Sequence, residues 1–210
     1  MLIKWIVCKV IPEHRTSFSK AQEAWQELSD VDGFIAQFGG WDLKNSGDAC
    51  ILGLWKDKES YDQFMNHVHD NVFETNSQEN TYESISVGLF DTVLDMPGLH
   101  SNLVTSLCDG KYLRVADCKV KPDHVDHFVA VQREIWIPEM AKAKGMIGGN
   151  FNRSPCEDRF IVTTLWTEQK LHDEYSKNIV PSLREKANVS NDLIHMTGRF
   201  VLLEPTWEVN

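Results

Sequence analysis

The sequence lacks the features that mark several large classes of protein. No run approaches the roughly 18 apolar residues of a membrane-spanning helix, and there are no low-complexity tracts. The chain has five cysteines, an odd number without a C-x-x-C pair, so neither a disulfide framework nor a metal or redox motif is indicated. A glycine-rich phosphate loop, G-x-S-x-G and H-E-x-x-H are also missing. These absences argue against phosphoryl transfer, serine hydrolysis and zinc proteolysis.

Basic residues are scarce, and the excess of acid lies in the first half. The chain carries 21 Lys and Arg against 31 Asp and Glu, for a net charge of −10. Residues 1–96 carry 7 basic and 16 acidic side chains, whereas residues 97–210 carry 14 and 15. Because polyanions are not attracted to an acidic protein without a basic stripe, we expect no nucleic-acid or membrane partner. The first residues, Met1–Trp5, indicate a strand and not a signal peptide, so the expected location is the cytoplasm.

The sequence repeats itself in altered form. Residues 2–91 align with residues 112–203, so that Cys8 falls on Cys118 and Trp55 on Trp166 after small shifts in register. A period of about 110 residues exceeds the 20–50 residues of solenoid repeats and is the size of a small domain. We therefore expect a first domain at residues 1–93, a linker at 94–110 and a second domain at 111–205.

Each half predicts the order β-α-β-β-α-β. Strand-like runs are expected at residues 3–11, 34–43, 49–55, 82–93, 112–120, 160–166 and 192–203, with a further strand starting at Gly145. Helices are expected after Pro12 and Pro122 and again from Lys56 and Thr167, with Pro138 kinking or shortening the third of them in chain order. The pairs Gly39-Gly40 and Gly148-Gly149 are expected to form bulges.

This order is that of the ferredoxin-like split βαβ arrangement, which leaves one sheet face uncovered. Two such units can cover each other by packing sheet against sheet. The predicted fold class is therefore α+β, with two ferredoxin-like repeats packed as an intramolecular dimeric α+β barrel.

Three stretches of the second half resemble a known signature. They are Gly145-Met146-Ile147-Gly148-Gly149-Asn150, Asn152-Arg153-Ser154-Pro155 and Phe160–Glu168, and they resemble the antibiotic-biosynthesis-monooxygenase-like domains of dimeric α+β barrel proteins. The first half matches through Gly33-Phe34, Leu54-Trp55 and Lys56–Tyr61. Nearly the whole chain resembles the YdbC-like proteins, an uncharacterised tandem family of bacilli. The same scaffold serves haem-degrading enzymes, chlorite dismutases, muconolactone isomerases and non-enzymatic binders, so the fold does not choose among activities.

The resemblance implies a set of candidate site residues. Trp55 and Trp166 correspond to a tryptophan that can line the substrate site, although their repetition in both halves favours a packing role. Asn66 and His67 are the candidate catalytic groups, as hydrogen-bonding or proton-accepting side chains. His69 and Trp41 are further candidates for substrate binding.

The expected function is that of a small-molecule-binding barrel protein. Its leading form is a cofactor-independent monooxygenase acting on an aromatic or apolar substrate, whose anion reacts directly with oxygen in a dry pocket. One alternative is a haem-binding or haem-degrading protein with His67 or His69 as the axial ligand. The position at which relatives carry that histidine holds Phe64 here and Tyr175 in the second half, which disfavours haem. Another alternative is a non-catalytic ligand-binding or protein-interaction module. The chain is expected to be a monomer with pseudo-dimeric halves, or a homodimer.

Overall fold

The computed structural model describes residues 1–76 and 78–210, without the side chains of residues 74–76. The chain divides into two compact units. The first unit comprises Met1–Asp91 and Val201–Asn210, and the second comprises Thr92–Phe200. Strand β4 (Ser84–Pro97) starts in the first unit and ends in the second, while β8 (Leu193–Leu203) does the opposite. The predicted borders at 93 and 110 follow the sequence repeat, whereas the compact units exchange these strand ends.

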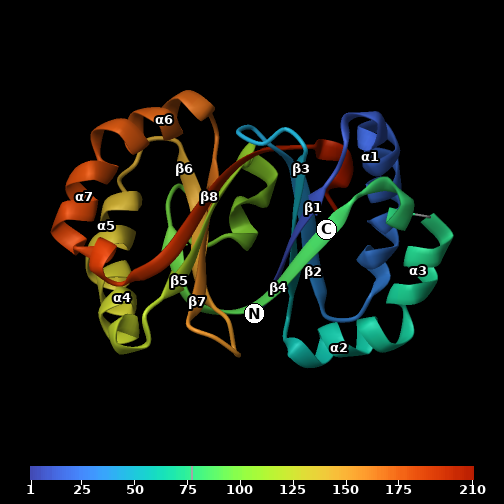
Figure 1. Cartoon of the computed structure of the whole chain (residues 1–210), viewed down its shortest axis with the longest axis horizontal. Coiled ribbons are helices and arrows are strands. Elements are labelled where there is room, and N and C mark those ends of the chain that lie inside the picture. The colour runs from blue at the N-terminus through green and yellow to red at the C-terminus, as the bar shows by residue number, and fades with distance from the viewer. Residues whose placement is uncertain (77) are drawn as a thin grey trace. The chain divides into compact units, whose positions relative to one another are not determined.

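The first unit is an antiparallel sheet with helices on one side (Figure 1). Its strands follow the order β4-β1-β3-β2, and the end of β8 pairs with β2. Its other elements are β1 (Leu2–Lys9), α1 (Arg15–Glu23), β2 (Phe34–Asp42), β3 (Asp48–Trp55), α2 (Lys58–His67), α3 (His69–Asn76) and 3-10 helices at Pro12–His14, Ala24–Asp30, Gln78–Thr81 and Pro205–Trp207. The expected order of strands and helices is confirmed for this half.

The start of α2 is fixed by a side-chain cap. The Asp57 carboxylate accepts hydrogen bonds from the backbone N–H of Ser60 at 2.9 Å and from its hydroxyl at 2.8 Å, as expected of an N-cap. These two bonds lower the pKa of Asp57. Gly33 lies against the same turn with φ +79°, and a Cβ there would meet Ser60 Oγ at 2.2 Å. Only glycine fits this approach, which positions β2 beside the start of α2.

The second unit contains the same order of strands and helices. Its strands follow the order β8-β5-β7-β6, and β4 neighbours β6. Its other elements are β5 (Tyr112–Val120), α4 (Val125–Val131), α5 (Ile137–Met140), β6 (Met146–Arg153), β7 (Arg159–Trp166), α6 (Gln169–Asn178), α7 (Val180–Ala187), a π-helical turn at Gln132–Trp136 and 3-10 helices at Val104–Asp109, Pro122–His124 and Val189–Asn191. The four α-helices lie on one side of these strands (Figure 1).

Pro138 changes the helix without breaking it. Between α4 and α5 the backbone widens into a π-turn, in which the N–H of Ile137 reaches the carbonyl of Gln132, five residues back. Pro138, which has no N–H to offer, then lies in the first turn of α5, where its missing donor costs little. The expected disruption therefore takes the form of one wide turn.

The segment between β4 and β5 is ordered and belongs to the second unit. Strand β4 runs to Pro97, four residues beyond its expected end at Val93. The chain then continues along β6, with the backbone N–H of His100 donating to the carbonyl of Ile147 at 2.7 Å. Gly148 permits this approach, because a Cβ there would meet the hydroxyl of Ser106 at 2.1 Å.

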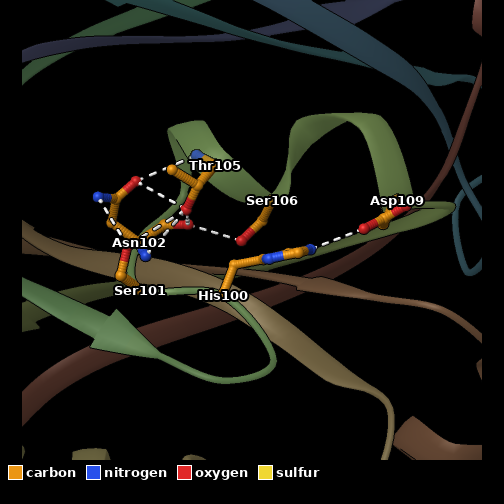
Figure 2. A network of polar contacts seen from close by, with 6 residues as sticks. All are labelled: His100, Ser101, Asn102, Thr105, Ser106 and Asp109. Carbon is orange, nitrogen blue, oxygen red and sulfur yellow. Dashed lines mark hydrogen bonds and ion pairs between the residues drawn. The ribbon is translucent and has the colours of Figure 1, made fainter.

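A polar network holds the same segment together (Figure 2). His100 Nε2 lies 2.6 Å from a carboxylate oxygen of Asp109, and the Ser106 hydroxyl donates to the carbonyl of Asn102 at 2.6 Å. The side-chain oxygen of Asn102 accepts the backbone N–H of Thr105 at 3.1 Å. These short-range bonds are those of capped turns, so the network is sufficiently explained by local structure.

The expected bulges lie elsewhere in the strands. The register is uninterrupted at Gly39-Gly40, and the irregularities fall between Phe34 and Ala36 in β2 and between Met146 and Gly148 in β6. The prediction was therefore wrong for Gly39-Gly40. A Cβ at Gly40 would lie 1.9 Å from the carbonyl oxygen of Leu202, so this glycine permits close strand pairing.

The fold class is α+β, as expected. Hydrogen bonding joins the strands in the order β1-β3-β2-β8-β5-β7-β6-β4, which closes on itself because β4 also pairs with β1. The sheet-against-sheet packing of two repeats stays a prediction. Within residues 1–76 and 78–210, no helix is both long and apolar enough to cross a membrane.

Candidate ligand-binding site

Trp55 lies at the centre of an aromatic cluster in the first unit. Its side chain is 1% exposed and stacks on Phe64 of α2, with ring centroids 4.9 Å apart. The edges of Phe34 and Tyr61 meet it at 5.2 and 5.7 Å. His69 joins the cluster through Phe64, at 5.6 Å. The structure thus brings two of the predicted substrate-binding residues, Trp55 and His69, against the same phenylalanine.

His69 is held by a neighbouring acid as well as by rings. Its Nδ1 lies 2.9 Å from Asp70 Oδ1, and its ring is parallel to that of Phe73 at 5.7 Å. The side chain keeps 20% of its surface exposed. His69 therefore closes one side of the cluster with a partly accessible imidazole.

The two candidate catalytic residues lie on the outer surface. Asn66 and His67 occupy the last turn of α2, and both are exposed, whereas Tyr61 and Phe64 of the same helix are buried. A group that acts in a dry pocket must face that pocket. The catalytic role of Asn66 and His67 stays a prediction, and their position gives it no support.

Trp41 and Trp166 belong to other clusters. Trp41 packs against Trp207 at 5.4 Å and Phe18 at 5.8 Å, and the Arg15 guanidinium lies 3.8 Å from its ring centroid. Trp166 lies in the second unit. Of the predicted residues in the first unit, Trp41, Asn66 and His67 therefore lie outside the Trp55 cluster.

Two polar side chains that we did not predict, Lys4 and Gln37, lie beside Trp55. Lys4 of β1 and Gln37 of β2 flank Gly53 of β3 in register, so all three lie in one row on one face of the sheet. A Cβ added to Gly53 would lie 3.6 Å from Trp55 Nε1, 3.7 Å from Lys4 Cβ and 4.0 Å from Gln37 Oε1. The position over Gly53 is thus bordered by an indole N–H, an amide oxygen and the stem of a lysine.

The Gln37 side chain is buried, and its amide N–H group has no hydrogen-bond partner among the described residues. Gln37 is 6% exposed, and its backbone pairs with Val209 through bonds of 2.7 and 2.8 Å. Within the described part of the chain, its side-chain Nε2 has no hydrogen-bond partner. Leaving a buried donor unsatisfied costs about 1–3 kcal/mol, so an acceptor supplied from outside would be favoured here.

Lys4 is half-buried among aromatic rings. Its ammonium lies 5.3 Å from the ring centroid of Tyr61 and 5.9 Å from that of Phe64. No carboxylate of the described residues forms an ion pair with it. Burial lowers the pKa of Lys4 to about 8, since desolvation disfavours the charged amine. Burial likewise raises the pKa of Tyr61, with a smaller contribution from the charge of Asp62.

The second unit carries a different set of residues at the matching positions. Arg114 stands at the place of Lys4, because it pairs with Thr164 of β7 as Lys4 pairs with Gly53 of β3. The Thr164 hydroxyl accepts the N–H of Trp166 at 3.0 Å, and His172 meets the Trp166 ring at 5.1 Å. The indole of this unit is satisfied within the protein.

Two features of the second unit are further candidates for a binding site. A groove of about 500 Å³ is lined by Gly98, Leu99, parts of residues 141–147, Thr167 and Leu171, and none of the predicted site residues lines it. Tyr175 is buried with no hydrogen-bond partner for its hydroxyl among the described residues, and burial raises its pKa. Neither feature brings polar side chains of several strands beside one point, as the first unit does.

The described side chains offer no ready metal site: no group of three or more His, Cys, Asp or Glu residues is arranged to hold an ion.

Comparisons with known proteins give relatives in sequence and in fold. A family model described as a domain of unknown function, DUF4937, matches residues 2–90. The uncharacterised protein YdbC of Bacillus subtilis (strain 168) is 38% identical over 105 residues, which cover 49% of this chain and 87% of YdbC. The range matched by the family model includes Lys4, Gln37, Gly53 and Trp55 of the first unit.

Solved structures resemble nearly the whole chain. A candidate monooxygenase from Lactobacillus acidophilus NCFM has a TM-score of 0.72 at 12% identity, covering 96% of this chain and 93% of its own. Another, from Fusobacterium nucleatum, has a TM-score of 0.76 at 10% identity, covering 96% and 91%. An anthrone oxidase-like protein has a TM-score of 0.73 at 11% identity, covering 97% and 91%. At such identities the likeness shows the fold alone, that of monooxygenase-like α+β proteins.

Proposed function

The chain belongs to the family of the uncharacterised protein YdbC. We propose that it binds a small aromatic or apolar molecule in the first unit, over Gly53. The observation that carries this proposal is the convergence of the Trp55 indole N–H, the Gln37 amide and the Lys4 side chain on one point. Binding sites for small molecules combine apolar walls with a few such polar groups. The rings of Tyr61 and Phe64 supply the apolar wall.

Exposed side chains of β4 support access to this place. Leu89 of β4 pairs with Lys4, and Val87 lies two residues along the same face. Val87 is 47% exposed, and Ile85, a further two residues along, is 48% exposed. Exposed apolar side chains beside a polar cluster are a common mark of binding grooves.

We propose cofactor-independent oxygenation as the chemistry at this site. In that reaction the substrate supplies the electrons, and one atom of O₂ enters the product while the other leaves as water. The protein needs to hold the substrate anion and to exclude water. Lys4 and the Trp55 indole are suited to the first task, and the buried rings are suited to the second.

A non-catalytic binding protein is the second candidate function. It is favoured by one observation, the exposure of Asn66 and His67 on the surface of α2. Under this candidate the same site holds its ligand without turnover.

The test is a thermal-shift screen of aromatic compounds, followed by an oxygen electrode for every compound that stabilises the protein. The proposal expects stabilisation that Trp55→Phe weakens and that His67→Ala, on the exposed surface, leaves unchanged. Oxygen uptake would support the monooxygenase and its absence the second candidate. A screen in which no compound raises the melting temperature would refute binding in both forms.

The pairing of the two repeats within one chain, predicted from the sequence, is part of the proposal. Native mass spectrometry is expected to show a 24.1 kDa monomer. A stable homodimer would favour association of two chains over a monomer.

A further inference from the structure

The proposed function leaves the chemistry of the ligand open. Resting on that function, we propose that Lys4, Gln37 and Trp55 form an oxyanion subsite that binds the carboxylate or phenolate group of an aromatic acid. The negatively charged oxygen would lie over Gly53, and the aromatic body would lie toward the rings of the cluster.

The two units differ beside the repeated tryptophan. Thr164 and Gly53 stand at matching positions, each two residues before the repeated tryptophan. In the second unit the Thr164 hydroxyl oxygen accepts the Trp166 N–H at 3.0 Å. In the first unit glycine brings no oxygen to this place, and the Trp55 N–H has no acceptor among the described residues. A ligand oxygen over Gly53 would occupy the position that the threonine hydroxyl takes in the second unit.

The Gln37 amide supports the same assignment. Its Nε2 is buried and unpartnered among the described residues. Its Oε1 is the amide atom nearest the point over Gly53, and a half-turn of the amide about its Cγ–Cδ bond would present the Nε2 donor there instead. In the second unit the corresponding row position is Gly149, which pairs with Thr164 and has no side chain to offer. The two differences occur together. The second unit has the Thr164 hydroxyl as acceptor and no amide side chain, whereas the first unit has Gly53 and the Gln37 amide.

Lys4 determines the charge of the expected ligand. Lys4 borders the row from β1, and no acidic side chain of the described residues pairs with its ammonium. A half-buried cation with an indole N–H and an amide donor beside it favours an anionic oxygen over a neutral one, because charge-assisted hydrogen bonds are about twice as strong as neutral ones. A cationic ligand would be repelled.

Carboxylates and phenolates share this chemistry, and three probes separate them. Calorimetric titration at neutral pH uses 2-naphthoate as the carboxylate and 2-naphthalenemethanol as its uncharged analogue. 4-Nitrophenol is the phenolate probe, because its anion absorbs visible light and its neutral form does not. We expect 2-naphthoate to bind at least about tenfold more tightly than 2-naphthalenemethanol, which corresponds to one charge-assisted contact. If the subsite takes phenolates, the protein will also increase the yellow absorbance of 4-nitrophenol.

Three variants test the residues. Lys4→Met removes the cation and is expected to weaken 2-naphthoate about tenfold, with little effect on 2-naphthalenemethanol. Gly53→Thr installs the hydroxyl that Thr164 provides in the second unit, and it should abolish binding of the acid. A Cβ at Gly53 makes only ordinary contacts, of 3.6–4.0 Å, so this variant should fold. Lys20→Met, on the exposed side of α1, removes the same charge elsewhere and should bind like the parent.

The outcomes separate this inference from the function on which it rests. If 2-naphthoate and 2-naphthalenemethanol bind equally and Lys4→Met changes neither, the oxyanion subsite is refuted while binding over Gly53 stands. If Gly53→Thr binds 2-naphthoate like the parent, the assignment of the place is refuted. If no probe binds to the parent, both the subsite and the proposed function fall.

Discussion

Replacing Lys4 with methionine is expected to stabilise the protein at neutral pH, although the same change removes the cation of the proposed site. The ammonium of Lys4 lies over Tyr61 and Phe64 without a carboxylate partner among the described residues. Methionine retains an unbranched apolar stem that fits such a place. Folding then no longer requires a charge to leave water.

The magnitude follows from the pKa of the amine. Burial lowers the pKa of Lys4 from 10.5 to about 8, and each unit of difference corresponds to about 1.4 kcal/mol. The full cost of holding the charged form in the folded state is thus about 3 kcal/mol, as an upper bound. Residual exposure reduces this cost, and the variant also loses the two ring contacts, worth about 0.5–1 kcal/mol each. We expect Lys4→Met to gain about 1–2 kcal/mol in free energy of unfolding at neutral pH.

The gain should disappear in alkali. Below pH 8 the amine is charged in both states, so the folded parent bears the full cost. Between about pH 8 and 10.5 the folded amine loses its proton while the unfolded amine keeps it, so the stability of the parent rises with pH. The difference between parent and variant should therefore shrink between about pH 7 and about pH 9.5.

Urea unfolding followed by tryptophan fluorescence measures the difference in free energy of unfolding between the parent and Lys4→Met. Five of the seven tryptophans lie in the first unit, so the signal reports mainly on the unit that contains Lys4. Tyr61, the titratable group that faces Lys4, has a raised pKa and stays neutral across this range. Lys20→Met is the control, with no pH-dependent gain expected. A Lys4→Met variant that is less stable at pH 7, by an amount that does not vary with pH, would show that the amine is well solvated and that the reasoning is wrong.

Three further predictions concern packing and reactivity. Gly33→Ala should lower the free energy of unfolding by about 1–3 kcal/mol in urea titration, because φ is +79° and the new Cβ would meet Ser60 Oγ at 2.2 Å; Gly53→Ala, without such contacts, should change it little, and equal losses would contradict the argument. Thr164→Val should cost about 1–3 kcal/mol, since it leaves the buried Trp166 N–H without its acceptor, and an unchanged urea midpoint would refute the role of this bond. Iodoacetamide should modify the exposed Cys108 and Cys156 and spare the buried thiols, because burial raises the pKa of Cys8 and Cys118 to about 12. Intact mass should show two adducts on the folded protein and five after denaturation. Fast modification of Cys8 would contradict its burial.

The strands and helices followed from the sequence because their periodicity is local. The strand expected at 49–55 is observed at Asp48–Trp55, and the helix expected from Lys56 starts at Lys58 after its cap. The end of β4 was missed because Asp95, Met96 and Pro97 resemble a turn. A proline that ends a strand needs no ladder donor, so β4 extends through it.

The candidate site could be predicted only in part, because it depends on register. Trp55 was identified from its repetition, and the structure confirms that it is buried among aromatic side chains. Lys4 carried a weaker signal, since it interrupts the apolar strand Leu2–Lys9 at a position that alternation turns toward the buried face. Gln37 and Gly53 carried none, because only the pairing of β1, β3 and β2 places them in one row. Contacts between strands distant in sequence do not follow from the periodicity of one strand.

The comparison of the two tryptophans separates their structural role from a role in binding. Both are buried and both end a strand, at Trp55 and Trp166, and a packing role alone would predict similar neighbours. The neighbours differ instead in a concerted way: the second unit pairs its indole with a threonine hydroxyl, whereas the first replaces threonine by glycine and adds a glutamine donor. A buried amide donor without a partner costs stability, and a half-buried lysine adds to that cost. Stability alone would remove both features, which supports the proposal that they hold a ligand beside Trp55.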